Sequence, residues 1–379
     1  METPSICTII AKNYIAFART LCDSFLDLHP EGTCYVLFID DTEGFLDTAS
    51  ERFKAHHLHE LAIPDQRNFC FKYTITELST AVKPYYLRYL LETAKLGKIL
   101  YLDPDILLLH RLDKLFESLD QANVLLTPHL DTDFPEDGGF PDDGHILKSG
   151  IFNLGFIGVR HDENVSRFLR WWEDKLYDKC VIDHARGYFV DQRFIDLAYI
   201  LFDNMQIVRD TGYNVAYWNL HSREVEFREG EWTCNGAPLY FYHFSNYRPD
   251  QPESLSGFQN RIRLSDRPFL KMLYSLYTGM LMKNGYEESS RWPYTHGHYA
   301  DETPIRDDTR KVYRTLMRRL RLDDPFRRLS HPPSLRLASA LAGIYSCSRR
   351  WIRNRAIHHD GLLRRLATTF YGPFPSRKD

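Results

Sequence analysis

The chain has 379 residues, of which 43% are hydrophobic and 14% aromatic, and its formal net charge is -3. This length allows one large domain with an appendage, or two domains. The hydrophobic content excludes a chain that is disordered throughout, and the small net charge identifies no partner.

The charge is unevenly distributed along the chain. Residues 306–379 contain 18 Lys/Arg and 6 Asp/Glu, a net of +12, whereas the remaining residues contain 30 basic and 45 acidic side chains, a net of -15. A basic end behind an acidic body predicts contact with something anionic, such as a membrane surface or a nucleic acid.

The seven cysteines are scattered and form no CxxC pair. This pattern argues against a disulfide framework and a structural zinc site, so we expect a reduced, cytoplasmic setting. The N-terminus has no basic region followed by a long apolar stretch, so no signal peptide is expected. No apolar run approaches the roughly 18–20 residues that a membrane span needs. The cysteines are Cys7, Cys22, Cys34, Cys70, Cys180, Cys234 and Cys347.

The N-terminal residues predict a strand, a helix and a second strand. Residues 7–11 and 34–39 are short apolar runs typical of buried strands, and residues 14–28 carry apolar side chains at helical spacing. Such a unit within about 35 residues implies a parallel sheet.

The alternation continues through the middle of the chain. Residues 79–94 predict a helix, and residues 98–102, KILYL, predict a buried strand. Further strands are expected at 123–126, 152–159 and 239–243, a helix at 163–177, and a loop at 131–144, which is rich in Asp, Gly and Pro. We therefore predict an α/β fold with a mostly parallel sheet and helices on both faces.

The alternation stops near residue 250, and helices are expected at 266–284, 309–321 and within 334–370. The predicted organisation is a body over residues 1–250, a helical and loop extension over 251–305, and a basic helical region over 306–379.

Two carboxylates follow the KILYL strand, in Asp103-Pro104-Asp105. Alternate residues of a strand point the same way, so Asp103 and Asp105 are expected to face one site, and ligands of open α/β sheets bind beyond the carboxyl ends of strands. The tripeptide alone is more typical of a strand-ending turn than of a site. Apolar runs on both sides favour a site, because charges are rarely placed there without a partner.

At this point the sequence resembles the GT-A glycosyltransferases, and among them the retaining, family-8-like enzymes. The resemblance covers roughly residues 5–250 and implies a GT-A type, Rossmann-like catalytic domain. Its motifs, in order, are IIAKNYIAFARTLCDSF (9–25), KILYLDPDILLL (98–109), FNLGFIGV (152–159), VDQRFID (190–196), YN (213–214) and YHFSNYRP (242–249).

The resemblance implies a metal site. Asp103 and Asp105 would be two ligands, and His243 would be the third. A lone His at the end of an apolar strand is otherwise typical of a satisfied core or surface residue. The mixed ligand set favours Mn²⁺ over Mg²⁺, because imidazole suits transition metals better.

The resemblance also places residues around a nucleotide-sugar donor. Ala11 and Asn13 match positions near the nucleotide. Asp41 ends the second strand, where it would contact the base or ribose, or act as a turn residue. Arg248 stands where the family usually has a Lys that grips the diphosphate, and a guanidinium can bind it bidentately.

Further candidate residues would contact the phosphates and the sugar of the donor. Lys83 and Arg88 precede the Asp103 strand, and each either reaches a phosphate or faces solvent. Asn153, Asp191 and Gln192 match positions beside the sugar and its reacting carbon. Retention would use a nucleophile such as Asp191, or a same-face attack that needs only positioning and stabilisation of the leaving group. The alternative for the pair 191–192 is a helix N-terminus capped by Asp191.

Two positions depart from the family pattern. Lys12 replaces the acidic residue that commonly contacts uracil, and Asn246 replaces the glycine of the last motif. UDP is the first expectation for the nucleotide, with GDP or another nucleotide as the alternative.

The basic residues 334–370 combine arginines with aromatic and aliphatic side chains. This composition suits the interface of an anionic membrane, and hence a lipid-linked acceptor. It equally suits a helical cap packed on the body with a solvated basic face. Nucleic-acid binding is not expected, because no recognised motif is present.

These observations and the resemblance together predict a metal-dependent glycosyltransferase, a hexosyltransferase that moves a sugar from a nucleotide-sugar to a glycan or glycolipid. Retention is implied by the resemblance alone. It would be cytoplasmic or peripheral on the inner membrane face. One alternative is a nucleotidyltransferase, which predicts a Gly-rich phosphate loop that the N-terminus lacks. Another is a non-catalytic module that binds nucleotide-sugar or membrane, which predicts a broken metal site.

Overall fold

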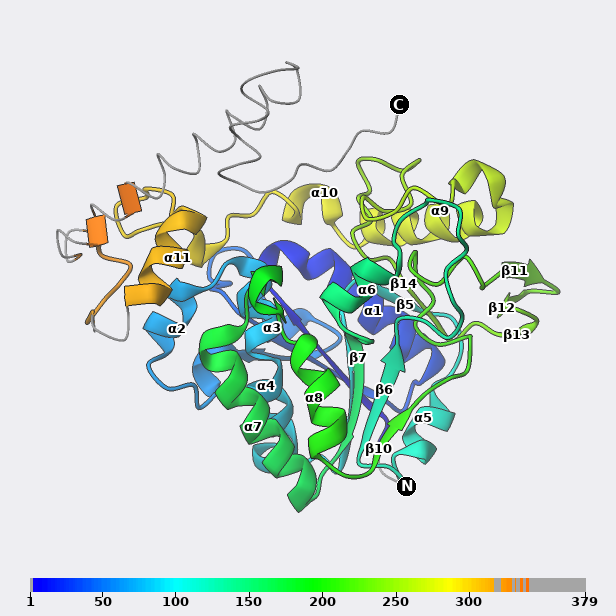
Figure 1. Ribbon diagram of the computed structural model, residues 1–379, viewed down its shortest axis with the longest axis horizontal. Helices are drawn as coiled ribbons and strands as arrows, with labels where there is room; N and C mark the ends of the chain where they lie inside the picture. Colours follow the sequence, from blue (N-terminus) through cyan, green and yellow to red (C-terminus); the bar gives the residue numbers. More distant parts are fainter. Residues whose placement is uncertain (1–2, 317–321, 329–330, 332–334, 337–338, 341–379) are drawn as a thin grey trace, which may run out of the picture. The chain divides into compact units, whose positions relative to one another are not determined.

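In the computed structural model, residues 3–316, 322–328, 331, 335–336 and 339–340 are described (Figure 1). The chain divides into two compact units. The first comprises Met1–Gln66 and Ile75–His296, and the second comprises Arg67–Thr74 and Gly297–Asp379.

The first unit is built on a seven-stranded sheet with the order β10-β6-β7-β4-β1-β2-β3. Neighbouring strands run parallel except at β7, which is antiparallel to both β4 and β6. The predicted mostly parallel sheet is therefore confirmed. Its strands are β1 (Ser5–Ile10), β2 (Thr33–Phe38), β3 (Lys54–His57), β4 (Lys98–Leu102), β6 (Val124–Pro128), β7 (Phe152–Arg160) and β10 (Met205–Ile207).

Helices cover both faces of this sheet, as predicted. Side chains alternate across a strand, so Ile6 and Ile10 of β1 share one core with residues of α1 and α5. On the opposite face, the ammonium of Lys83 in α4 lies over the ring of Tyr101 in β4. Figure 1 shows α4, α7 and α8 together beside β7. The helices are α1 (Ile15–Leu28), α5 (Asp113–Ser118), α4 (Lys83–Arg88), α7 (Glu163–Lys179) and α8 (Arg193–Leu201).

A two-stranded ribbon connects this core to a second one. β5 (Ile106–Leu108) pairs antiparallel with β14 (Phe241–His243). Its side chains alternate between the cores: Ile106 and Phe241 belong to the first, whereas Leu107 and Tyr242 belong to the second. The second core also receives residues of α9 (Pro268–Lys283) and of the small sheet β11 (Val225–Arg228), β12 (Glu231–Cys234) and β13 (Ala237–Pro238).

The helix predicted at 79–94 is divided in the structure. α3 (Ile75–Ala81) ends before Val82, α4 begins with Pro84 in its first turn, and Tyr89–Thr93 forms a π-helical turn. Proline is tolerated in a first helical turn but not in a helix interior, so Pro84 separates the two helices. The remaining short elements of this unit are α6 (Asp143–Ser149), α10 (Tyr286–Ser289), β8 (Ile182–Asp183) and β9 (Tyr188–Phe189).

The second unit packs around Phe71 of α2 (Gln66–Lys72), whose ring meets Tyr313 of α11 (Asp307–Leu316) and Phe326 edge-on. Within residues 334–370, only 335–336 and 339–340 are described, so the predicted basic helices lie outside the described residues. No described helix is both long enough and apolar enough to cross a membrane.

Candidate metal centre

The two predicted metal-binding carboxylates lie where the chain leaves the sheet. After β4 ends at Leu102, the backbone N–H of Asp103 still donates to the carbonyl of Gly155 at 2.8 Å. The hydroxyl of Tyr101 donates to Asp103 Oδ1 at 2.6 Å. The carbonyl of Asp105 accepts from the backbone N–H of Phe244 at 2.8 Å. The apolar runs around Asp103-Pro104-Asp105 are therefore explained by β4 on one side and the ribbon strand β5 on the other.

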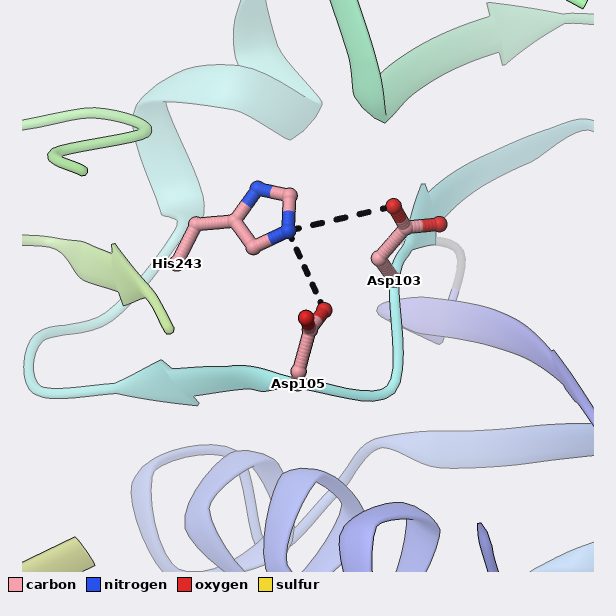
Figure 2. A group of neighbouring side chains, drawn as sticks. All are labelled: Asp103, Asp105 and His243. Atoms are coloured by element: carbon pink, nitrogen blue, oxygen red, sulfur yellow. Dashed lines mark ion pairs between the residues drawn. The ribbon is translucent and has the colours of Figure 1, made fainter. Parts of the chain in front are cut away.

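The ribbon brings His243 to these carboxylates from about 140 residues later in the chain. His243 pairs with Ile106, the residue after Asp105. Its Nε2 lies 3.1 Å from Asp105 Oδ1 and 3.9 Å from Asp103 Oδ2, and Figure 2 shows the imidazole directed at both carboxylates. One ligand atom from each residue lies within 4.8 Å of the others. The structure thus brings the three predicted ligands into one cluster.

The electrostatics of the cluster favour a cation. Burial lowers the pKa of His243, but Asp105 and then Asp103 raise it more, so its pKa is raised overall. The His243 side chain is 4% exposed, whereas those of Asp103 and Asp105 are 30% and 22% exposed. Two carboxylates and one imidazole, open on the carboxylate side, form a donor set that fits Mn²⁺.

Gly155 makes room for the His243 ring. A Cβ at position 155 would lie 2.7 Å from His243 Nδ1 and closer still to Cε1. Contacts this short are not found between real side chains, so only glycine fits here. This steric requirement explains the glycine of the FNLG motif and adds it to the site.

The second nitrogen of His243 contacts a buried amide network. His243 Nδ1 lies 3.2 Å from Asn214 Oδ1, and Asn214 Nδ2 donates to Asn153 Oδ1 at 3.0 Å. Asn153 Nδ2 lies 3.3 Å from His129 Nε2. Burial lowers the pKa of His129 to about 4. Asn153 was predicted beside the sugar, whereas no role was predicted for Asn214, although the YN motif contains it.

Lys83 and Asp191 form a buried ion pair next to this cluster. Lys83 Nζ lies 2.6 Å from Asp191 Oδ2, 3.9 Å from Asp103 Oδ1, and 2.7 Å from the carbonyl of Leu154. The Lys83 and Asp191 side chains are 1% and 3% exposed. Burial raises the pKa of Asp191 and Lys83 opposes it, with a net rise. Val190, directly before Asp191, has a φ of +40°, which is strained for a β-branched residue.

The capping alternative for Asp191 is wrong. The N-cap of α8 is Gln192, which forms no side-chain cap hydrogen bond. Gln192 instead donates from Nε2 to the carbonyl of Ser149 at 2.8 Å, and its Oε1 accepts from the N–H of Leu154 at 3.5 Å. It therefore joins α8 to the two ends of the segment 149–154.

The residues at the ends of β1 and β2 form a second polar group. Lys12 Nζ lies 3.0 Å from Asp40 Oδ2 and 3.0 Å from Thr295 Oγ1, and it is buried. Ala11 is buried beside it, and Asn13 lies in the following 3-10 turn. Asp41 is exposed, and its carboxylate accepts from the N–H of Glu43 at 3.0 Å, as a turn residue does. The resemblance led us to expect an acidic residue at position 12. The lysine found there is buried and pairs with the buried carboxylate of Asp40.

The two arginines that were predicted to contact the phosphates form ion pairs outside the Asp103, Asp105 and His243 cluster. Arg88 Nε lies 2.6 Å from Glu173 Oε1. Arg248 pairs with Asp250 at 3.1 Å, and its side chain is 61% exposed. Asn246, where the resemblance led us to expect a glycine, has a φ of +57°. Asn is among the residues that adopt this left-handed conformation.

A clasp joins the loop 131–142 to the segment 256–263. Arg261 donates two hydrogen bonds to Asp137, at 2.8 and 2.9 Å, and a third to the carbonyl of Pro141 at 2.8 Å. Asn260 exchanges hydrogen bonds with the backbone of Phe140 at 2.8 and 3.1 Å. The Asp/Gly/Pro-rich loop is therefore held at its centre by side chains from a distant segment.

No family model matches this chain. Two proteins of Bacillus subtilis (strain 168), both described as uncharacterized, are similar to it. YfnF is 26% identical over 280 residues, covering 72% of this chain and 90% of YfnF. YfnD is 23% identical over 284 residues, covering 73% of this chain and 88% of YfnD.

Solved glycosyltransferases are similar to this chain in structure. The galactosyltransferase LgtC, solved with donor and acceptor sugar analogs, has a TM-score of 0.41 and 16% identity, covering 73% of this chain and 95% of LgtC. The glycosyltransferase GlyE of Streptococcus pneumoniae TIGR4 has a TM-score of 0.45 and 14% identity, covering 79% and 67%. At these scores and identities, the comparisons assign no activity to the chain.

Proposed function

We propose that this protein is a metal-dependent glycosyltransferase that moves a sugar, with retention, from a nucleotide-sugar, first of all a UDP-sugar, to a carbohydrate or lipid-linked acceptor. One observation carries this proposal: Asp103, Asp105 and His243 converge at the carboxyl end of β4. β4 lies beside β1 in the sheet, and nucleotides bind beyond the carboxyl ends of the strands in open α/β sheets.

Asp103, Asp105 and His243 would hold Mn²⁺ or Mg²⁺. When bound, the ion offsets the negative charge that develops on the departing nucleoside diphosphate. Ala11, Asn13 and Asp41, at the ends of β1 and β2, are proposed to contact the nucleotide. Arg248 is 61% exposed and pairs with Asp250 at 3.1 Å, and it is proposed to exchange that partner for a diphosphate.

Lys83, Asp191 and Gln192 are proposed to shape the sugar end of the site. The Asp191 carboxylate is 3% exposed and bound to Lys83, which suits a positioning role better than attack on the sugar. We therefore favour same-face attack by the acceptor, with Lys83 adding positive charge 3.9 Å from Asp103. Arg88, bound to Glu173, is proposed to support the helix layer instead of contacting the phosphates.

The test combines a donor screen with a ligand variant. UDP-, GDP-, dTDP- and CMP-sugars are screened by thermal shift with Mn²⁺, and release of the corresponding nucleotide, UDP, GDP, dTDP or CMP, is then measured for the donor that stabilises the protein. Asp105→Ala should lower Mn²⁺-dependent turnover by at least ~10²-fold, the usual cost of losing one preorganised charge-stabilising group.

The matched control is Asp27→Ala on α1, where the carboxylate is 71% exposed and pairs with Arg52 at 3.6 Å. It should retain wild-type turnover. Stabilisation by no donor, or full activity of Asp105→Ala, would refute the proposed function.

A further inference from the structure

We propose that Asn214 is a positioning residue that holds a proton on His243 Nδ1, so that Nε2 is the nitrogen that binds the metal. This inference rests on the proposed metal-binding function. It follows from a chain of buried hydrogen bonds that begins at a backbone N–H, where the donor is unambiguous.

The first link fixes the amide of Asn153. Its Oδ1 accepts from the backbone N–H of Gly155 at 3.1 Å. Because a backbone N–H can only donate, the atom that faces it must be the oxygen. The Asn153 Nδ2 group therefore faces His129 Nε2 at 3.3 Å, which must accept. This agrees with a neutral His129, whose pKa burial lowers to about 4.

The second link fixes the amide of Asn214. The atom that contacts Asn153 Oδ1, at 3.0 Å, must be a donor, so it is the Asn214 NH₂ group. The same group donates to Thr127 Oγ1 at 2.7 Å. Asn214 Oδ1 then faces His243 Nδ1 at 3.2 Å. An amide oxygen can only accept, so Nδ1 carries a proton. Nε2 lies 3.1 Å from Asp105 Oδ1, which is also an acceptor, so Nε2 donates to it in the absence of a metal, and a bound metal would take the place of that proton.

The segment around Asn214 is held firmly enough for this role. Asn214 is 1% exposed, its φ is +52°, and its carbonyl accepts from Asn219 Nδ2 at 3.0 Å. The carbonyl of the next residue, Val215, accepts from the backbone N–H of His243 at 2.8 Å. Adjacent residues thus hold both the backbone and the ring of His243.

The test replaces Asn214 with two residues that tolerate its backbone conformation. Asn214→Gly removes the acceptor without straining a positive φ, and it should weaken Mn²⁺ binding by about 10–100-fold, the usual effect of losing such a partner. Asn214→Asp keeps an acceptor for Nδ1–H, although its carboxylate cannot donate to Asn153 Oδ1 as the amide does, and it should bind Mn²⁺ more tightly than Asn214→Gly. Affinity is measured by calorimetric titration of the full chain with Mn²⁺ alone.

The matched control is Asn235→Gly. Asn235 has the same φ of +52°, but it is exposed and bonds only to backbone groups of Glu224 and Ser222. This variant should bind Mn²⁺ like wild type. Wild-type affinity in Asn214→Gly would overturn the role of Asn214 while leaving the metal site intact, whereas a wild-type protein that binds no Mn²⁺ would overturn the metal site itself.

A measurement on the unmutated protein covers the case in which Asn214→Gly does not fold. Long-range ¹H–¹⁵N spectra of the histidine side chains, with diamagnetic Zn²⁺ bound, should show His243 protonated at Nδ1 and unprotonated at Nε2. The opposite tautomer would contradict the inference, because Asn214 Oδ1 could not then face Nδ1.

Discussion

At the scale of single residues, the proposed metal centre depends on the absence of a side chain at Gly155. Gly155→Ala should push His243 away from Asp105, because the new Cβ would lie 2.7 Å from Nδ1. We expect Mn²⁺ affinity to fall by at least ~10-fold, measured by calorimetric titration.

Gly279→Ala is the control for that change. A Cβ at Gly279 in α9 meets nothing within 4 Å, and Ala in a helix interior is more favourable than Gly by about 0.5–1 kcal/mol. The control should bind Mn²⁺ normally and melt at a slightly higher temperature. Normal Mn²⁺ binding by Gly155→Ala would show that the ring position is not critical.

His129 predicts a pH dependence of stability. Burial lowers its pKa to about 4 in the folded protein, below the value of about 6.5 in an unfolded chain. As pH falls below about 6.5, the unfolded state takes up the proton first, so the free energy of unfolding decreases until about pH 4. The contribution is on the order of 3 kcal/mol, and it is fully present only above pH 6.5.

Denaturant unfolding between pH 4 and 7.5 measures this dependence. His129→Gln cannot titrate, so its free energy of unfolding should fall less steeply with acid than that of wild type. His59→Gln, at an exposed histidine, should behave like wild type. Equal slopes for His129→Gln and wild type would contradict a buried neutral His129.

The sequence predicted part of this site. The strand context predicted that Asp103 and Asp105 face one site, and the family resemblance added His243. The three residues do meet, because the apolar runs around them form β4 and the ribbon. The role of Asn214 was not predicted, because it depends on hydrogen bonds to residues of β6 and β7. The sequence around Asn214 does not show that these strands lie next to it. The pairing of Lys83 with Asp191 was missed for the same reason.

At the scale of elements, buried apolar strands were predictable, and short strands that are partly exposed were not. β1, β4 and β7 are almost entirely buried, so their residues form continuous apolar runs. β3 and β10 are short and partly exposed, and they carry no such signal. One strand of the ribbon, β14, was predicted. Its partner β5 was not, because only three residues, Asp103-Pro104-Asp105, separate it from β4 in the sequence.

The clasp at Arg261 gives a prediction for the loop 131–142. Arg261→Ala removes three hydrogen bonds to Asp137 and Pro141, so the backbone amides of residues 131–141 should exchange hydrogen several-fold faster. Exchange is measured by mass spectrometry on the folded protein. Arg186→Ala is the control, because Arg186 pairs only locally with Asp183. Unchanged exchange at 131–141 in Arg261→Ala would show that the loop does not need the clasp.

At the scale of the whole molecule, the α/β class and the helices on both faces followed from the order of apolar runs. The predicted boundaries at residues 250 and 305 stay predictions. The observed first unit runs to His296 because α9 packs into the second core, with Leu273 and Tyr277 among its buried residues. That packing joins segments far apart in the chain, which local composition does not reveal.

The basic residues at the C-terminal end are expected to bind an anionic membrane surface. Residues 341–379 contain eight Lys/Arg and two Asp/Glu and lie outside the described residues. If they bind an anionic inner-membrane surface, the full chain should sediment with phosphatidylglycerol-containing vesicles, less so at high salt, whereas a chain ending at residue 340 should not. Vesicles of neutral lipid are the control. Equal sedimentation of both chains would refute the membrane role.

Asp103, Asp105 and His243 are proposed to hold a divalent ion beside a bound nucleotide. Crystals grown with Mn²⁺ and UDP, measured at the manganese absorption edge, test it most directly. We predict an anomalous peak within bonding distance of His243 Nε2 and of both carboxylates, with the diphosphate against it. No manganese peak at these residues, or a nucleotide bound away from the ends of β1 and β4, would contradict the account.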